Sequence, residues 1–447
     1  MNLPDDAKKI IDLLLDSGYS AYAVGGCVRD AFMDRKGGDV DITTSALPKQ
    51  TESVLSNNGI RYIETGLKHG TVTAVLNGEN YEITTFRTDG SYLDNRHPDS
   101  VNFVTDIKED LARRDFTVNA MAYNDRDGVV DVYGGKQDID RRLIRCVGDP
   151  DRRFNEDALR IMRALRFASV LGFEIEPDTS RSIISNKDLL KNIAAERIFV
   201  ELKKLLLGDN VERILTDYSD VIAVIIPELK PCFDFPQNSK WHIYDVYTHI
   251  VKTVADSPKK DYIRFAMLCH DIGKPFSRQT DADGDHFKGH PAVSLTMTED
   301  ILRRLKVSND FYKKVTTLVS IHDAHIHRNP VSVKTWLSQL GENMIYDFLD
   351  VKIADMMSHN LALAQHELDE LRSIKDYVPT VIASGEPYLI SHLAIHGNDL
   401  VAMGYKGKEI SDELNALLST VISAPSQNTK SALLTRARAD KSKNISR

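Results

Sequence analysis

The sequence contains no apolar run of membrane-spanning length, and its first residues, MNLPDDAKKI, are too acidic and polar for a signal peptide. Cysteine is scarce: Cys27, Cys146, Cys232 and Cys269 lie far apart and never have CxxC spacing. This spacing argues against a disulfide framework and against a cysteine zinc site, and it favours a reducing compartment. We therefore expect a cytoplasmic protein that does not associate with membranes.

Positive charge is not in excess either, since the 447 residues have a formal net charge of −8. Net charge alone does not exclude a nucleic-acid partner, because binding depends on local basic clusters that contact phosphates. Such clusters occur at residues 141–145, at Arg152-Arg153 and in the tail from Lys430 to Arg447. Hydrophobic residues (42%) and charged residues (27%) are present in ordinary proportions for a globular protein. A chain of this length is expected to form about two to four domains.

The stretch VGGCVRDAFMDRKGGDVD is the most informative part of the sequence. It predicts a strand that ends before a Gly25-Gly26 turn, a short helix that opens near Arg29, and a second strand carrying Asp39 and Asp41. Glycines let backbone amides approach an anion, and side chains two apart on a strand face the same way. A glycine turn beside paired carboxylates suits Mg²⁺ and a nucleoside triphosphate. Taken separately, a glycine pair is usually a simple turn, and such carboxylates usually lie on a solvated strand edge.

The first third of the chain mixes helical and strand patterns. Apolar spacing predicts a helix over residues 5–17, and two β-rich runs predict a hairpin around Asn77-Gly78. A helical pattern returns in DLARRDFTVNAMAY, with Leu111, Phe116 and Met121 facing inward, and VVDVYGGKQDI then predicts a short β pair. Beyond about residue 150 the patterns are almost wholly helical. The sequence therefore predicts an α+β chain whose later part is all-α.

Five motifs in this order carry a family resemblance: GGCVRD, GDVDITTSALP, RHPDSVNF, DLARRDFTVNA and EDALRIMRALRF. Together they resemble the class II tRNA nucleotidyltransferases and bacterial poly(A) polymerases. The resemblance implies a polymerase-β-like nucleotidyltransferase head at 1–148, a helical neck at 149–235, a helical body at 236–360 and a helical tail at 361–447. It implies an enzyme that transfers CMP, CMP and AMP from CTP and ATP to the 3′ end of tRNA.

The resemblance also assigns roles within the head. Asp39 and Asp41 match the family's catalytic, Mg²⁺-binding pair. The glycine turn and an arginine of the RRDFT motif match nucleotide-binding positions; these residues are Gly25, Gly26, Arg29 and Arg114. Asp115 is expected to pair with Arg114 or to orient a neighbour, and Asp110 is a candidate for a third carboxylate.

The helix expected to begin at Asn155 carries Asp157, Arg160, Arg163 and Arg166 at every third position. On one helix, Asp157 and Arg160 would be neighbours. In the family, the matching aspartate and arginine read the incoming base, and the later arginines line the nucleotide site. A carboxylate acceptor beside an arginine donor complements cytosine and adenine and mismatches guanine and uracil. Without the head motifs, a salt-bridged surface helix would be the better interpretation.

The irregular stretch DGSYLDNRHP matches the family's flexible loop, which is associated with the passage from CTP to ATP. Its full length favours a complete CCA-adding enzyme. Arg87, Asp94 and Arg96 are candidate residues of this region.

A second group of residues in the body resembles the His-Asp (HD) pattern of metal-dependent phosphohydrolases. His249, His270-Asp271 in LCHDIGKP, His290 and Asp323 can together bind a second divalent metal and leave positions open for a phosphate ester. Further histidines near this pattern are ligands, helpers or surface residues: His242, His322, His325 and His327. Some relatives keep such a domain only as a scaffold for RNA.

Three alternatives remain open at this point. A poly(A) polymerase shares most of the head motifs. A metal-dependent phosphohydrolase could use the head only to bind RNA, and a non-catalytic RNA-binding protein is disfavoured because paired carboxylates repel phosphate unless a metal is bound. We expect the tail, including GYKGKEI at 404–410 and the basic end, to bind tRNA.

Overall fold

The computed structural model describes residues 1–447 except 2, 36–37, 67–69, 91–99, 283 and 446–447. The chain forms two compact units, one of residues 1–230 with 301–307 and one of residues 231–300 with 308–447. Within these described ranges, no helix is long and apolar enough to cross a membrane. The finer division into head, neck, body and tail stays a prediction.

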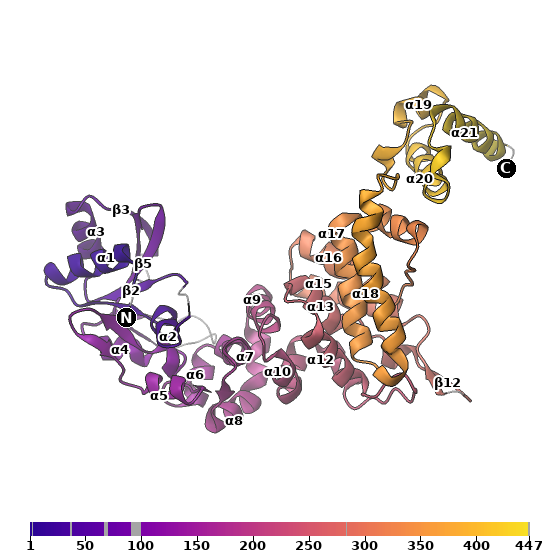
Figure 1. The fold of residues 1–447 in the computed structure, drawn as a ribbon. Helices are drawn as coiled ribbons and strands as arrows, with labels where there is room; N and C mark the ends of the chain where they lie inside the picture. The colour runs from indigo at the N-terminus through magenta and orange to yellow at the C-terminus, as the bar shows by residue number, and fades with distance from the viewer. Residues whose placement is uncertain (2, 36–37, 67–69, 91–99, 283, 446–447) are drawn as a thin grey trace. The chain divides into compact units, whose positions relative to one another are not determined.

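The first unit opens with a seven-stranded sheet in the order β3-β4-β5-β2-β1-β8-β9, seen at the indigo end of the chain in Figure 1. Only β2 and β5 pair in parallel; the other neighbours are antiparallel. The strands are β1 (Ala21–Val24), β2 (Asp41–Thr44), β3 (Arg61–Gly66), β4 (Thr71–Leu76), β5 (Glu79–Thr85), β8 (Ala122–Asn124) and β9 (Gly128–Val130). Helices α1 (Asp5–Asp16) and α3 (Pro48–Asn57) pack against this sheet. A separate pair, β6 (Arg87–Asp89) and β7 (Val101–Phe103), flanks the irregular stretch.

Local patterns predicted several elements correctly. The first helix is confirmed as α1, and the hairpin between β4 and β5 turns at Asn77-Gly78. Asn77 has φ 50° and Gly78 has φ 87°, which is the left-handed conformation that a two-residue hairpin turn requires. Asparagine and glycine adopt it at low cost, so this turn sets the register of the two strands.

Two predicted elements are wrong. The segment DLARRDFTVNAMAY is not one helix, because α4 (Ile107–Ala112) ends early and Phe116 is extended, forming a bridge with Cys146. The Asp115 carboxylate accepts the Phe116 N–H, which replaces a helical hydrogen bond. The GGKQDI part of the predicted β pair forms helix α5 (Gly135–Asp140) instead. Asp131 causes this, since its carboxylate accepts the first N–H groups of that helix.

Helices follow the sheet in the first unit. They are α6 (Pro150–Glu156), α7 (Leu159–Leu171), α8 (Pro177–Asn186), α9 (Ala195–Leu206), α10 (Val211–Asp217) and α11 (Ser219–Ile225). The short strands β10 (Leu143–Ile144) and β11 (Glu174–Ile175) pair in parallel and join this helical part to the end of the head. Helix α7 packs on α9 and is buried along most of its length. It is therefore a core element, held firmly enough to position side chains.

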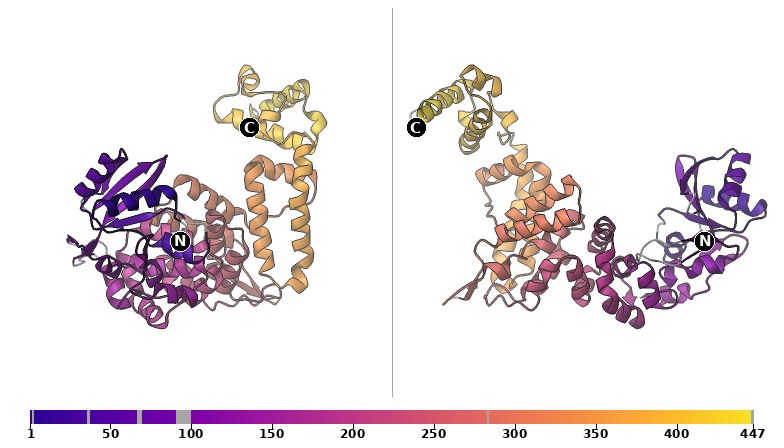
Figure 2. Two further views of the ribbon diagram at one scale, coloured as in Figure 1. Left: turned by 60° about the vertical axis from the view of Figure 1, so that its left-hand side comes forward. Right: turned by 180° about the vertical axis from the view of Figure 1, so that it is seen from behind.

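Among the described residues of the second unit, the only strands are β12 (Gln279–Asp281) and β13 (Gly284–His286), which form a small hairpin; the other regular elements are helices. Its helices are α12 (Val246–Asp256), α13 (Asp261–Cys269), α14 (Lys274–Ser277), α15 (His290–Arg304), α16 (Asn309–Ile321), α17 (Pro330–Met357), α18 (Leu361–Ala383), α19 (Gly397–Ala402), α20 (Lys408–Ser423) and α21 (Lys430–Ile445). The last turn of α15, residues 301–304, belongs to the first unit. Helices α17 and α18 pack against each other and lie side by side in the left view of Figure 2. The last three helices share a small apolar core that includes Leu400, Leu417 and Leu433.

Candidate active site

The glycine turn follows β1 directly. Gly25 has φ 80° and ψ −128°, a conformation that only glycine adopts readily, and its N–H donates to the carbonyl of Met121. Helix α2 (Gly26–Phe32) then begins at Gly26, earlier than the predicted start near Arg29. A β-carbon on Gly25 would lie 3.2 Å from Nη1 of Arg114. The turn is therefore shaped so that an arginine side chain can lie against bare backbone.

The paired carboxylates lie beside this turn. Asp41 opens β2 and is the register partner of Val24, the residue just before the turn. Asp39 precedes the strand instead of lying on it, which corrects the prediction that β2 carries both. Asp39 and Asp41 are exposed, whereas Val40 and Ile42 are buried. This alternation agrees with the expectation that the two carboxylates share one side of the chain.

A third carboxylate, Glu82, was not found from the sequence. Strand β5 runs parallel to β2 with Ile83 opposite Ile42, so Glu82 lies next to Asp41, and both are exposed. The surrounding protein partly desolvates the Asp41 carboxylate and raises its pKa, Arg114 acts to lower the pKa, and Glu82 and Asp39 raise it further. The alternation of YEITT, with Glu82 between buried neighbours, could have marked it.

The prediction that Asp110 supplies the third carboxylate is wrong. Asp110 is fully buried, and its Oδ1 lies 2.8 Å from Arg113 while its Oδ2 lies 3.3 Å from Arg114. Burial acts to raise the pKa of Asp110, but the two arginines outweigh it and lower the pKa. Asp110 therefore anchors Arg114 and does not face a ligand.

A chain of hydrogen bonds links the turn to α7. Arg29 Nη1 donates to Asn119 Oδ1 over 2.7 Å, and Asn119 Nδ2 donates to Asp115 Oδ1 over 3.1 Å. Asp115 Oδ2 in turn accepts from Arg163 Nε over 2.8 Å. Burial acts to raise the pKa of Asp115, but Arg163 and the hydrogen bonds from Asn119 and Phe116 lower it to about 2. Of the two expected roles of Asp115, the structure agrees with the second: it pairs with Arg163 and orients Asn119, and it is not the partner of Arg114.

The helix carrying the base-reading pair does not begin at Asn155. Asp157 lies between α6 and α7 with extended dihedral angles (φ −138°, ψ 102°), and its Oδ1 accepts the Leu159 N–H. Asp157 Oδ2 lies 3.1 Å from Arg197, whereas Arg160 Nη1 lies 2.8 Å from Glu156. The prediction that one helix carries both residues is wrong, because Asp157 caps α7 from outside the helix. The two residues are still neighbours, since the Arg160 N–H donates to the carbonyl of Asp157 over 3.0 Å.

Arg160 also ties α7 to the head. Its Nη2 donates to the carbonyl of Arg113 over 2.9 Å, one residue before the Arg114 that lies against Gly25. Arg166 is paired with Glu201, its Nε lying 2.6 Å from the carboxylate. The structure thus brings the two predicted groups, the glycine turn and the base-reading pair, into one compact unit.

Sequence reasoning missed Glu156, Arg197, Glu201 and Asn119. Glu156 precedes Arg160 by four residues, a spacing that could have revealed it. The others come from distant segments.

Arg87, the first of the three loop candidates, begins β6, and its N–H donates to Asp110 Oδ1 over 3.3 Å. The other two loop candidates, Asp94 and Arg96, lie outside the described residues.

The chain is similar to known proteins along most of its length. The family model described as "Poly A polymerase head domain" matches residues 21–145, and "Probable RNA and SrmB- binding site of polymerase A" matches 172–233. "tRNA nucleotidyltransferase domain 2 putative" matches 292–437. A CCA-adding enzyme of Lactobacillus helveticus is 34% identical over 436 residues, which cover 96% of each chain. The chain belongs to the CCA-adding enzyme family.

Further relatives in the CCA-adding enzyme family agree with this. A CCA-adding enzyme of Geobacillus stearothermophilus is 50% identical over 210 residues, which cover 47% of this chain and 51% of that one. The crystal structure of the Bacillus stearothermophilus CCA-adding enzyme in complex with CTP is 30% identical, with a TM-score of 0.70 over 99% of this chain and 100% of that chain. The predicted family, fold class and enzyme class, a tRNA nucleotidyltransferase, are confirmed.

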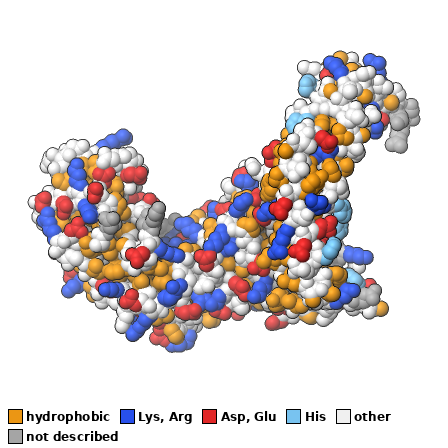
Figure 3. Space-filling model, viewed as in Figure 1, with side chains coloured by type: hydrophobic (Ala, Val, Ile, Leu, Met, Phe, Trp, Pro, Cys, Tyr) orange, Lys and Arg blue, Asp and Glu red, His pale blue; other side chains and the backbone are white. Residues whose placement is uncertain are grey.

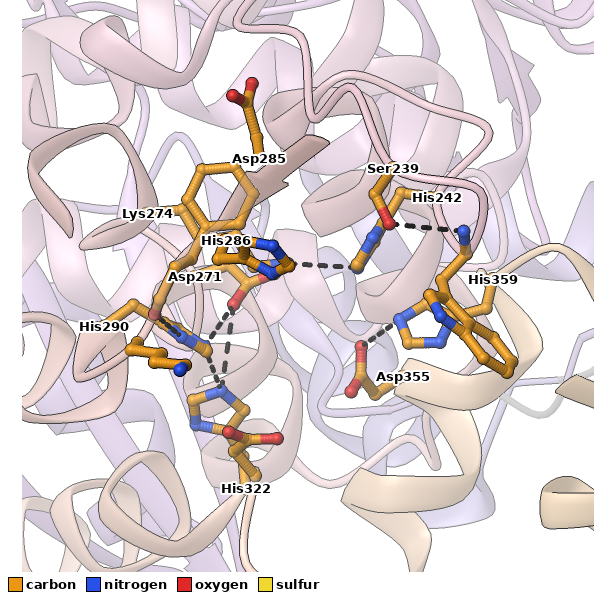
Figure 4. A pocket seen from close by; sticks show the side chains of 14 residues that line it. Ser239, His242, Asp271, Lys274, Asp285, His286, His290, His322, Asp355 and His359 are labelled. Atoms are coloured by element: carbon orange, nitrogen blue, oxygen red, sulfur yellow. Dashed lines mark hydrogen bonds and ion pairs between the residues drawn. The ribbon is translucent and has the colours of Figure 1, made fainter. Parts of the chain in front are cut away.

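The second unit contains the histidine cluster that the sequence suggested in part. Three groups of side chains offer ligand atoms within 4.8 Å of one another. They are His249, His270 and Asp271; Asp271, His290 and His322; and His249, Asp355 and His359. Most of these residues line a cavity of about 300 Å³, shown in Figure 4. Asp323 lines that cavity but contributes to none of the three groups found among the described residues.

The ring nitrogens of this cluster point at one another. Nδ1 of His270, His290 and His322 each lies 2.7–2.8 Å from the backbone carbonyl three residues earlier. A carbonyl only accepts, so Nδ1 carries the proton and a neutral ring presents its Nε2 lone pair to the centre. Nε2 of His290 and Nε2 of His322 are 3.0 Å apart. Two facing lone pairs repel unless a cation or a proton lies between them.

The buried carboxylates of the cluster attract positive charge, either a proton or a metal ion. Burial acts to lower the pKa of His270, but Asp271 and Asp355 outweigh it and raise the pKa to about 10. Burial lowers the pKa of His322 to about 3, and it lowers that of His242 to about 2. Nε2 of His249 lies 3.3 Å from Asp271 and 2.9 Å from Asp355 without making a hydrogen bond to either.

The outcome for the HD candidates is mixed. His249, His270, Asp271 and His290 come together as expected, and His322 joins them. The carboxylate expected from Asp323 comes instead from Asp355, on α17. His325 and His327 are exposed and line a different, open cavity. The spacing of Asp355 and His359, four apart at the end of a helix, could have indicated this part of the cluster.

Proposed function

We propose that this chain adds CMP, CMP and AMP, taken from CTP and ATP, to the 3′ end of tRNA. The observation that carries the proposal is the link between Arg160 and the carbonyl of Arg113. It ties the base-reading segment to the strand–turn unit that holds the carboxylates, as a protein-templated polymerase requires. Membership of the CCA-adding enzyme family supports the same reaction.

Asp39, Asp41 and Glu82 would hold Mg²⁺. Their fit rests on chemistry, since carboxylate oxygens are the ligands that Mg²⁺ prefers, and three of them lie together on one side of the sheet. When bound, Mg²⁺ lowers the pKa of the attacking 3′-hydroxyl and neutralises the triphosphate. The glycine turn and Arg29 bind phosphate oxygens, and Arg114 faces the same turn.

The base is selected by Asp157 and Arg160. Each is held by a second residue, Asp157 by Arg197 and Arg160 by Glu156, so neither must reorganise to meet a base. Asp157 accepts from the exocyclic amino group of cytosine or adenine, and Arg160 donates to the adjacent ring nitrogen. Guanine and uracil present the opposite pattern and are rejected.

The tail and its basic helix bind tRNA phosphates. Lys441 on α21 contacts the carbonyl of Met403 over 2.6 Å and lies over Tyr405, so the 404–407 turn and α21 form one surface. Lysine and arginine side chains alternate with acidic ones on the face shown in Figure 3, so the net charge of −8 does not make that face uniformly acidic.

The four cysteines are free and buried, which supports a cytoplasmic location.

The test is nucleotide addition to tRNA that lacks its 3′ end, with each triphosphate supplied alone and together. We expect CTP alone to add two residues and ATP to add one only after them. Asp39→Asn should abolish both additions. Long tails made from ATP alone would favour a poly(A) polymerase, and full activity of Asp39→Asn would disprove the site.

The histidine cluster supports a second function, a metal-dependent phosphohydrolase. Histidine and aspartate ligands favour a divalent transition metal, and the adjoining cavity is lined by Lys274, a cation for a phosphate ester. Lys274 Nζ lies 2.7 Å from Asp271 and is buried, so it is fixed beside the cluster.

His249→Ala should lower the metal content of the purified protein, measured by elemental analysis, and abolish hydrolysis of p-nitrophenyl phosphate. Nucleotide addition should not change. His327→Ala, an exposed histidine outside the cluster, is the matched control. Equal metal content in the two variants would argue against a metal site.

A further inference from the structure

Three arginines of the nucleotide site share one aromatic ring. Phe167 lies on α7 and is 6% exposed. The guanidinium carbon of Arg166 is 3.8 Å from its ring centroid, that of Arg29 is 5.2 Å away and that of Arg163 is 5.5 Å away. Phe116 supports the ring edge-on at 5.9 Å. Residues from α2 and from α7 therefore meet on one phenyl group.

Placing three like charges together is costly, and that cost is seen at Arg166, whereas Asp115 raises the pKa of Arg163. Burial lowers the pKa of Arg166, and the charges of Arg163 and Arg29 lower it further, while Glu201 acts in the other direction. Each arginine has one carboxylate partner: Asp30 for Arg29, Asp115 for Arg163 and Glu201 for Arg166. The electron-rich face of a phenyl ring attracts a guanidinium without neutralising it.

A guanidinium has five N–H donors in its plane and an apolar face. Arg163 uses Nε and Nη2 on Asp115, and Arg166 turns Nε toward Glu201. No other described residue accepts from Nη1 of Arg163 or from the two Nη atoms of Arg166. The guanidinium groups of Arg163 and Arg166 lie over the Phe167 ring, and no described residue takes up these donors.

We propose that Phe167 is a positioning residue for nucleotide binding, whose ring fixes Arg29, Arg163 and Arg166 so that their remaining N–H groups can bind an anionic nucleoside triphosphate. The proposal rests on the proposed nucleotidyl transfer. A positioning role of Phe167 differs from a packing role in one respect. An aliphatic side chain of similar size would fill the core but would not hold the three guanidinium groups in place.

The test compares Phe167→Leu with Phe86→Leu. Phe86 is likewise a buried phenylalanine of the first unit, and it stacks on Tyr22; no arginine among the described residues lies over its ring. We expect Phe167→Leu to raise KM for CTP about ten-fold, with kcat changed less than about three-fold, because the lost contacts are cation–π contacts to binding residues. Phe86→Leu should lower the melting temperature without changing KM, and Phe167→Tyr should restore KM.

Wild-type KM in Phe167→Leu, or an equal rise in KM in both leucine variants, would overturn the proposal. If Phe167→Leu does not fold, Phe167→Met allows the same comparison with a side chain of similar volume. Asp39→Asn distinguishes a failure of the Phe167 proposal from a failure of the proposed nucleotidyl transfer. If it abolishes addition while Phe167→Leu leaves KM unchanged, the function stands and the role of Phe167 does not; if it retains addition, the proposed function fails first.

Discussion

Nη1 of Arg114 lies 3.2 Å from the position that a β-carbon on Gly25 would occupy. Arg114 is held there from the other side by Asp110, which is buried and shared with Arg113. Glycine is thus required at this position for two independent reasons, the close approach of the arginine and the positive φ of the turn. The phosphate-binding turn and the arginine beside it are built as one unit.

Gly25→Ala should therefore impair nucleotide addition beyond any loss of stability. The added methyl group displaces Arg114, and the positive φ costs about 1–2 kcal/mol of folding free energy. Gly18→Ala is the matched control, because Gly18 also has a positive φ (86°) but has nothing within 4 Å of its β-carbon position. Urea unfolding and kcat/KM for CTP would be measured in both. If the two variants lost activity equally, the contact with Arg114 would have no role.

Glu82→Gln should weaken metal use at the carboxylate site. Removing one of three neighbouring carboxylates leaves fewer oxygen ligands for a cation, so more Mg²⁺ should be needed for half-maximal addition, by about ten-fold. Glu79→Gln, an exposed residue at the start of the same strand, should behave like the wild type. The measurement is the rate of CMP addition across a Mg²⁺ titration. An unchanged Mg²⁺ requirement in Glu82→Gln would remove it from the site.

The Asp115–Arg163 pair predicts a pH dependence of stability. The pKa of Asp115 is about 2 in the folded chain, below its ordinary value of 3.8, so the pair stabilises the protein fully above about pH 4. That contribution, about 2 kcal/mol from the size of the shift, is lost as the pH falls from about 4 through 2. Asp115→Asn should be less stable at pH 7, and its difference from the wild type should vanish near pH 2.

Unfolding by urea, followed by circular dichroism at several pH values, measures this difference. Asp188→Asn removes an exposed carboxylate paired with Lys191 and serves as the control, with no measurable change expected at any pH. A constant difference between Asp115→Asn and the wild type from pH 7 to 2 would contradict the assignment.

The sequence predicted those parts of the site that are contiguous in the chain. The Gly25 turn and the Asp39/Asp41 pair depend on local conformation, which residue patterns report well. Glu82 reaches Asp41 only through the parallel pairing of β2 with β5, and Asp355 joins the histidine cluster from a later helix. Residue patterns within a short stretch of sequence do not report contacts between such distant segments.

The sequence did not predict the break between α6 and α7, for a different reason. The run EDALRIMRALRF has good helical periodicity, so a continuous helix was the natural expectation. Asp157 instead uses one oxygen to cap α7 and the other to pair with Arg197 of α9. Those tertiary contacts outweigh helix propensity, which is weak per residue. At this break the side chains of Asp157 and Arg160 have separate partners, Arg197 and Glu156.

That separation leads to a last prediction, on base selection. Arg160 is anchored by Glu156 through a contact of 2.8 Å, and Glu156 also contacts Arg153 over 2.9 Å. Glu156→Gln removes the charge that holds Arg160 while leaving Asp157 with Arg197. We expect UMP or GMP to be incorporated about ten-fold more often relative to CMP, because a loosened arginine no longer presents its donor at a fixed point. Single-nucleotide addition with each triphosphate measures this ratio, and the Asp188→Asn variant sets its baseline. If fidelity were unchanged while kcat fell, Glu156 would support the helix and not the choice of base.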